Sequence, residues 1–259
     1  AIFLRGNKTS AEVASLLTDL YKLKKPHAVK YSRRNDIRPF EDATSLEFFS
    51  KKADASQFLL ASHTKKRPHS LTLGRMYNHQ LLDMVELAVT NFRPSESFKA
   101  HKPAPGSKAC VVLNGDGFEN SYEQRRLGNM LLDFFRGPQV KKVSLSGLDH
   151  VVVCTQGPTA MHFRHYGLRL KKSGSKLPRV ELEEIGPSFD FTVRRHQFAA
   201  SDLYKEALRV PKQLRQAKVK NVEHNKLGDK MITVHMERQD LNTLALRKRK
   251  ALKRQREPD

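Results

Sequence analysis

The stretch ELEEIGPSFDFTVRRH, from Glu181 to His196, is the most informative about the fold that we expect for this chain. In its second part, Phe189, Phe191 and Val193 point to one face of an extended segment, and the polar residues between them point to the other. Gly186-Pro187 interrupts the extended pattern, because glycine permits unusual backbone angles and proline donates no amide hydrogen. The stretch therefore predicts two β-strands joined by a tight turn.

Similar short apolar runs occur on both sides of this stretch along the chain, and they predict a chain rich in strands. Most of the apolar runs are four to eight residues long and are bounded by Gly, Pro, Asn or Ser, as strands usually are. The run over 84–89 also suits a helix, but we favour a strand. The expected strands are 58–61, 71–77, 84–89, 109–113, 150–155, 161–171, 179–185 and 189–196.

Helical spacing of apolar residues marks two longer helices. Thr9 and Glu12 form the pattern of a capping box before the first helix, which Pro26 ends. Ser121 and Gln124 form the same pattern before the second, which Gly137-Pro138 ends. Two shorter helices are expected after Asp42 and over 201–210.

The chain reads as two related halves. Residues 91–108 have the composition of a linker, and we place two α/β halves at about 1–92 and 108–209, with the linker at about 93–107. Phe40-Glu41-Asp42 precedes a helix in one half and Phe118-Glu119-Asn120 in the other, and Pro68/Arg75 and Pro187/Arg194 share a seven-residue spacing. These parallels predict an α/β fold with two halves about a pseudo-twofold axis. A C-terminal extension, 210–259, would hold a strand near 230–237 and a basic tail over 241–259.

The charge of the chain indicates its partners. Its 259 residues carry 48 Lys and Arg against 27 Asp and Glu, a formal net charge of +21. Basic proteins bind nucleic acid by displacing the counterions of phosphates, so RNA or another polyanion is expected. The alternative is a solvated surface that keeps the protein soluble. No run of eighteen apolar residues occurs, so we expect no membrane partner.

The sequence shows no pattern typical of metal binding or catalysis. Cys110 and Cys154 lie in apolar runs without CxxC spacing, which predicts core packing rather than zinc. His162 and His165 fall on opposite faces of a strand, and the turn NGDGFEN (114–120) has too few acids for a calcium loop. No Walker A, GxGxxG or GxSxG pattern follows a strand, so we predict no catalytic residue, cofactor, metal or small-molecule substrate.

Cations in loops and at strand ends are the candidate RNA contacts. Each could instead be a solvated charge or an ion pair with Glu181, Glu183 or Glu184. The alternative function is an interaction scaffold whose sheet edges accept a partner's strand and whose RNA contacts are non-specific. The candidates are Lys65, Lys66, Arg67 and His69 in one loop; Arg75; Arg125 and Arg126; Arg194 and Arg195; and Arg247, Lys248, Arg249 and Lys250 in the tail.

Five segments together resemble the Brix-domain family of ribosome-assembly factors. They are PFEDATSLEFFS (39–50), KKRPHSLTLGRMY (65–77), FRG (135–137), SLSGLDHVV (144–152) and EIGPSFDFTVRRHQF (184–198). The resemblance implies two halves, each similar to the anticodon-binding domain of class II aminoacyl-tRNA synthetases, and no catalytic activity. It further implies an rRNA-binding heterodimer with the regulator-of-ribosome-synthesis protein. That pair would recruit 5S rRNA and its ribosomal proteins to the large-subunit precursor in the nucleolus of the nucleus.

Overall fold

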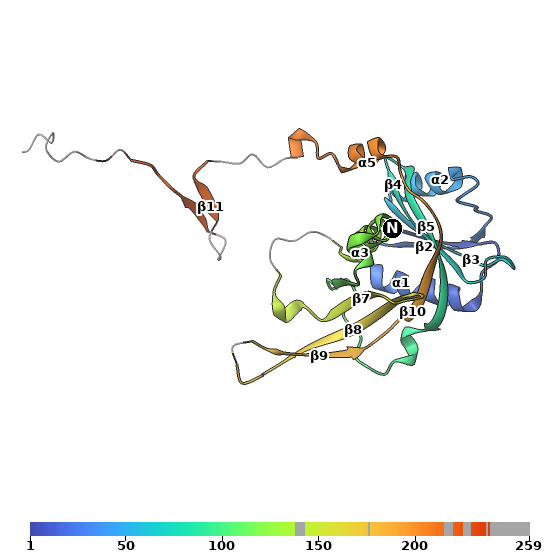
Figure 1. Cartoon of the computed structure of the whole chain (residues 1–259), viewed down its shortest axis with the longest axis horizontal. Helices are drawn as coiled ribbons and strands as arrows, with labels where there is room; N and C mark the ends of the chain where they lie inside the picture. Colours follow the sequence, from blue (N-terminus) through green and yellow to red (C-terminus); the bar gives the residue numbers. More distant parts are fainter. Residues whose placement is uncertain (138–142, 176, 215–219, 225–228, 237, 239–259) are drawn as a thin grey trace, which may run out of the picture. The chain divides into compact units, whose positions relative to one another are not determined.

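The computed structural model of the chain (Figure 1) describes residues 1–137, 143–175, 177–214, 220–224, 229–236 and 238. The chain divides into two compact units, Ala1–Leu208 and Arg209–Asp259, which are treated separately. The predicted tail with Arg247, Lys248, Arg249 and Lys250 lies outside the described residues.

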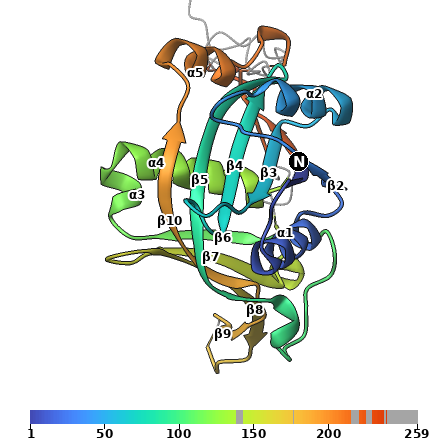
Figure 2. The same cartoon turned by 90° about the vertical axis from the view of Figure 1, so that its right-hand side faces the viewer.

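One large sheet organises the first unit. Its order is β2-β1-β3-β4-β5-β10-β8-β7-β6, and β9 pairs with β8 beside this path. In Figure 2, β7 and β8 run across the direction of β3, β4 and β5, so the sheet is strongly twisted. The strands are β1 (Ile2–Gly6), β2 (Val29–Asn35), β3 (Gln57–Ser62), β4 (Ser70–Tyr77), β5 (Gln80–Arg93), β6 (Cys110–Asn114), β7 (His150–Gln156), β8 (Met161–Lys171), β9 (Arg179–Glu184) and β10 (Ser188–Gln197).

Strand directions reveal the duplication. Strand β1 runs parallel to β3, which is followed by antiparallel β4 and β5; β6 runs parallel to β7, which is followed by antiparallel β8 and β10. The two series meet where β5 pairs antiparallel with β10, so both halves share one sheet. The α/β fold and its repeat are confirmed. The short sequence parallels between the halves were wrong. Phe40-Glu41-Asp42 follows β2, which has no counterpart in the second half. Arg75 lies on β4 and Arg194 on β10, but the counterpart of β4 is β8.

Helices cover the sheet unequally. Residues of α1 and α4, including Leu16, Leu131 and Phe134, share one buried cluster with β1, β3–β5, β7 and β10. Leu46 of α2 packs in a second cluster on the other face of the first half. The helices are α1 (Ala11–Lys24), α2 (Thr44–Ala53), α3 (Gly117–Asn120), α4 (Tyr122–Phe135) and α5 (Ser201–Leu208). The prediction of a strand at 84–89 is confirmed by β5.

Both predicted capping boxes are wrong. Helix α1 is capped by Ser10, whose hydroxyl accepts the Val13 N–H at 3.4 Å, while Thr9 donates to backbone carbonyls. Ser121 does precede α4, but its side chain makes no capping hydrogen bond. Asp42 accepts the Thr44 N–H at 2.9 Å, one residue before the N-cap of α2. The spacing of the capping residues therefore predicted where the helices begin to within one residue, but it did not predict which side chains make the capping hydrogen bonds.

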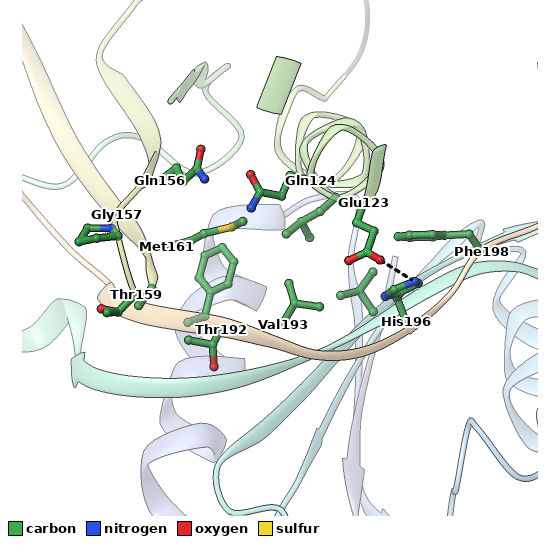
Figure 3. A pocket seen from close by; sticks show the side chains of 15 residues that line it. Glu123, Gln124, Gln156, Gly157, Thr159, Met161, Thr192, Val193, His196 and Phe198 are labelled. Atoms are coloured by element: carbon green, nitrogen blue, oxygen red, sulfur yellow. Dashed lines mark ion pairs between the residues drawn. The ribbon is translucent and has the colours of Figure 1, made fainter. Parts of the chain in front are cut away.

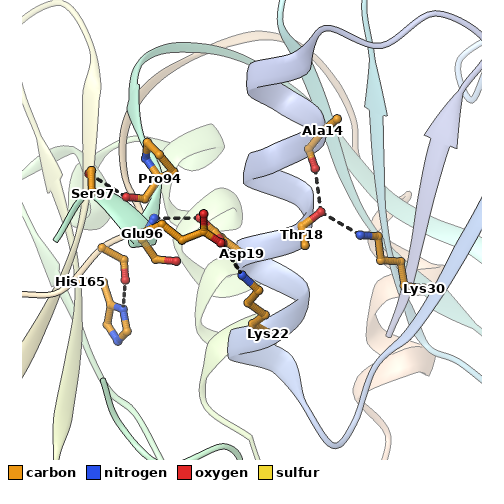
Figure 4. A network of polar contacts seen from close by, with 11 residues as sticks. Ala14, Thr18, Asp19, Lys22, Lys30, Pro94, Glu96, Ser97 and His165 are labelled. Atoms are coloured by element: carbon orange, nitrogen blue, oxygen red, sulfur yellow. Dashed lines mark hydrogen bonds and ion pairs between the residues drawn. The ribbon is translucent and has the colours of Figure 1, made fainter. Parts of the chain in front are cut away.

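The segment between the halves is tied to α1. Strand β5 continues to Arg93, beyond the expected start of linker composition at 91, and a 3₁₀ turn, η1 (Ser95–Ser97), follows. The buried Asp19 carboxylate accepts the Ser95 N–H at 2.9 Å (Figure 4). This bond gives a buried backbone donor its partner and fixes where the chain leaves β5.

The second unit is small. It holds a 3₁₀ turn, η3 (Lys212–Leu214), and the pair β11 (Val222–His224) and β12 (Lys230–Ile232). The predicted strand near 230–237 is therefore shorter than expected, because residues 233–236 have no strand partner in the described region.

Candidate nucleic-acid interface

Two predicted basic patches, 128 residues apart in sequence at Arg67 and Arg195, meet at the buried Glu86 of β5. A bulge in β10 makes this possible: Val193 pairs with Leu87, yet Arg195, two residues on, pairs with the very next residue, Glu86. Val85 and Leu87 face the core, so Glu86 and its partner point to the opposite, outer face. The bulge interrupts the alternation that the sequence predicted and sends both Arg194 and Arg195 outward.

Glu86 orients the cations around it. One carboxylate oxygen accepts the Ser70 hydroxyl at 2.5 Å, and the other binds Arg195 Nε and lies 4.0 Å from Arg67 Nη1. Burial alone would raise the pKa of Glu86, but these hydrogen bonds and positive charges outweigh it and lower the pKa. Arg195 also stacks on Phe40, with its guanidinium carbon 3.8 Å from the ring centre. Glu86 therefore stays ionised and holds Arg195 in one orientation.

A cleft of about 400 Å³ opens beside this cluster, and we call it the basic cleft. Its cations are Lys8, Arg38, Arg67 and Arg195, and its carboxylates are Asp36, Glu41 and Glu86. Arg38 is paired with Asp36 and Glu41, whereas Lys8 has no ion pair with any described residue. Sequence reasoning missed Lys8 and Arg38, because each follows a strand without a local pattern that distinguishes it from other surface cations.

The loop between β3 and β4 forms the rim of the basic cleft. Lys65 and Lys66 are exposed at its tip and have no ion pair among the described residues. The tip is a tight turn, because Thr64 and Arg67 exchange backbone hydrogen bonds of 3.0 and 3.2 Å. Arg194 donates to the Pro68 carbonyl at 2.7 Å and so ties β10 to the same loop. The loop thus presents two free ammonium groups from a defined backbone.

His69 anchors that loop instead of standing free to stack on a base. Its Nδ1 lies 3.1 Å from the Ser10 hydroxyl and 3.2 Å from the Glu12 carboxylate, and its ring packs edge-on against His63. His69, predicted as an RNA contact, therefore attaches the loop to the start of α1.

Two predicted RNA contacts are corrected by their burial. Arg75 is only 9 % exposed and donates to Asp83, Asn129 and Asp133 at 2.5, 2.7 and 2.6 Å. Burial would lower the pKa of Arg75, but the bonds to the two carboxylates and their charges outweigh it and raise the pKa. The guanidinium of Arg126 is also buried, 3.6 Å above the ring of Tyr204. Both arginines hold the two halves together and cannot reach a phosphate.

Arg125, by contrast, is exposed on α4 and donates to the Glu119 carbonyl. It lies on a different element from the basic cleft, and no described ion pair joins the two. The structure therefore brings together Arg67, Arg194 and Arg195, with Lys65 and Lys66 on the rim, and leaves Arg125 apart.

The structure also shows where the cysteines and the His162–His165 pair lie. Cys154 is buried in the core, where burial raises its thiol pKa to about 12, while Cys110 is partly exposed. His162 binds Asp190 on one face of β8, and His165 is buried on the other. Within the described ranges, no cluster of three His, Cys, Asp or Glu is arranged to hold a metal ion. None of the described helices combines the length and apolar character that crossing a membrane requires.

Comparison with known proteins identifies the family. The Brix domain matches residues 6–195. A human Ribosome production factor 2 homolog is 46 % identical over 228 residues, covering 88 % of this chain and 74 % of that protein. The Schizosaccharomyces pombe homolog of the same name is 44 % identical over 263 residues, covering 98 % and 83 %, and that of Arabidopsis thaliana is 45 % identical over 263 residues, covering 98 % and 84 %.

Solved structures are more distant. A probable ribosomal biogenesis protein from Aeropyrum pernix K1 is 12 % identical, with a TM-score of 0.47, over 73 % of this chain and 93 % of that one. An archaeal Imp4-like protein is also 12 % identical, with a TM-score of 0.38, over 76 % and 99 %. The family assignment rests on the sequence matches, and by these the chain belongs to the Brix-domain family.

Proposed function

We propose that this chain is a non-enzymatic ribosome biogenesis factor that binds rRNA through the basic cleft and its rim. Membership of the Brix family, with relatives named as ribosome production factors, implies a role in ribosome biogenesis. The observation that supports RNA binding is the convergence of Arg67 and Arg195 on Glu86, beside the unpaired Lys65 and Lys66. Cations fixed by a buried carboxylate present a defined spacing to phosphates without a folding step on binding.

The finer proposal concerns partners. With the regulator-of-ribosome-synthesis protein, the chain would recruit 5S rRNA and its ribosomal proteins to the large-subunit precursor in the nucleolus. Its cleft offers cations but few exposed stacking groups, so sequence preference should come mainly from RNA shape and from the joint surface with the partner. No catalytic step, cofactor or small-molecule substrate enters this proposal.

Affinity for 5S RNA measured across a salt series tests it. The variant Lys65→Glu/Lys66→Glu should weaken binding, and the slope of log K against log salt should fall by about two if each lysine meets one phosphate. The control is Lys51→Glu/Lys52→Glu, which makes the same charge change at exposed residues of α2. A size-matched unrelated RNA, with and without the partner, reports specificity.

An equal loss in both charge-reversal variants would show that only net charge matters. That result would contradict a defined interface and would leave the chain as a basic platform. Unchanged RNA binding in the loop variant, with partner binding lost, would instead favour the scaffold function.

The scaffold alternative has one observation in its favour. Among the described strands, β9 pairs only with β8, and its Val180 and Leu182 are 54 % and 53 % exposed. An unpaired edge strand with exposed apolar side chains can accept a strand from another protein. Retained RNA binding by a Val180→Lys/Leu182→Lys variant that loses the partner would separate the two activities.

A further inference from the structure

A cavity of about 260 Å³ lies between the first turn of α4, strand β10 and the turn that joins β7 to β8 (Figure 3). It is distinct from the basic cleft. Beyond the bulge in β10, His196 pairs with the inward-facing Val85 and lines this cavity, whereas Arg195 points to the opposite face. None of the predicted RNA contacts that the structure describes lines it.

The cavity combines an apolar floor with a rim that carries both aromatic and polar side chains. Leu127, Met161 and Phe191 belong to the buried core and form its floor. At its rim the rings of His196 and Phe198 are stacked, with centroids 4.5 Å apart and planes 22° from parallel. Glu123 also lines the cavity, and its exposed carboxylate lies 3.6 Å from His196 Nε2.

Two side-chain amides bring hydrogen-bonding groups to the cavity. Gln156 Oε1 accepts the Gly117 N–H at 2.7 Å, which fixes that amide and leaves its NH₂ group as a donor. The Gln124 side chain makes no hydrogen bond with any described residue, and its Oε1 is buried without a partner. Figure 3 shows the Gln124 nitrogen on the side of Met161. The Gln124 NH₂ group, which no described residue uses, can therefore donate a hydrogen bond to an acceptor atom of a ligand in the cavity.

We propose that this cavity binds one unstacked nucleobase of the bound RNA, with its acceptor edge on the amides of Gln124 and Gln156. Single-stranded RNA is recognised by bases that leave the stack, lie against aromatic rings and hydrogen-bond along their edges. The cavity combines these features, because it has an aromatic pair at its rim, an apolar floor and two amide NH₂ donors. The inference rests on the RNA-binding function proposed above and adds a second contact on the other face of β10.

Salt dependence separates this contact from the basic cleft. In the intact chain, Gln124→Leu should weaken binding of a single-stranded RNA about three- to tenfold at every salt concentration, because hydrogen bonds are lost but no phosphate contact is. Val193→Phe, which fills the cavity from β10, should do the same. The control for Gln124→Leu is Gln80→Leu, the same substitution at an exposed residue of β5, which should leave RNA affinity unchanged. Thermal unfolding of each variant checks that it is folded.

Photo-cross-linking locates the base directly. RNA containing 4-thiouridine should cross-link to peptides that carry Met161 or Phe198, and Val193→Phe should abolish those cross-links. Unchanged affinity in both variants, with cross-links confined to the loop of Lys65 and Lys66, would overturn the base site and leave the RNA-binding function standing. Unchanged RNA affinity with weakened binding of the partner protein would assign the cavity to a protein side chain and overturn it too. Failure of the unaltered chain to bind RNA even at low salt would overturn both proposals together.

Discussion

Replacing Asp83 by asparagine should destabilise the fold more than any comparable change at the surface. Asp83 is fully buried and binds Arg75 at 2.5 Å, accepts the Ala199 N–H at 2.9 Å and lies 3.8 Å from Arg126. Asparagine has nearly the same shape but no charge, so two buried guanidinium groups would lose their nearest counter-charge. Breaking a buried ion pair in this way costs about 3 to 5 kcal/mol.

The same arginine supplies a matched control. Asp133 binds Arg75 at 2.6 Å, but its side chain is 37 % exposed, and water can replace much of the lost interaction. Asp133→Asn should therefore cost at most about 1 kcal/mol. Urea unfolding followed by far-UV circular dichroism measures both, since the chain contains no tryptophan.

A double variant tests whether the loss comes from charge. Arg75→Gln/Asp83→Asn removes both partners, so it should cost less than the sum of the single changes, with a coupling of about 1 to 3 kcal/mol. A cost for Asp83→Asn no larger than that for Asp133→Asn would refute the reasoning, because burial would then make no difference to the pair.

Two further predictions concern pH and packing. Burial lowers the pKa of His165 from 6.5 to about 4. Above pH 6.5 the imidazole is neutral in both the folded and the unfolded chain, so its protonation does not affect stability. As the pH falls from 6.5 towards 4, only the unfolded chain takes up this proton, and the folded state loses stability. Between pH 7 and pH 5 the wild type should lose about 2 kcal/mol more stability than His165→Gln, measured by urea unfolding at each pH; equal losses would contradict burial as the cause. A Cβ at Gly74 would lie 2.2 Å from a ring carbon of Phe58, so Gly74→Ala should cost about 1 to 3 kcal/mol. A Cβ at Gly147 would meet no described residue within 4 Å other than its chain neighbours, so Gly147→Ala should be nearly neutral in thermal unfolding.

Much of the fold could be predicted because the signals that carry it are local. The alternation in Phe189, Phe191 and Val193 and the apolar stripe of α4 each follow from the period of one element, and each element formed where it was expected. β1 was missed as a strand because it is five residues long and buried along almost all its length, which leaves no alternation to detect.

The candidate site depended far more on tertiary structure. Arg67 and Arg75 look alike in sequence, eight residues apart in one basic segment, yet one lines the basic cleft and the other is buried against Asp83. Which of them is free follows from strand pairing and from the packing of α4, both of which join distant parts of the chain.

Motifs, periodicity and composition were enough to predict the family, the two α/β halves, the net charge of +21 and the segments that carry its cations. The folded chain was needed to establish that the halves share one sheet, that the bulge in β10 turns Arg195 towards Glu86, and that Gln124 lines a cavity instead of capping a helix. Periodicity and composition reflect residues that are close together in the sequence, whereas burial and ion pairing depend on distant residues that become neighbours when the chain folds.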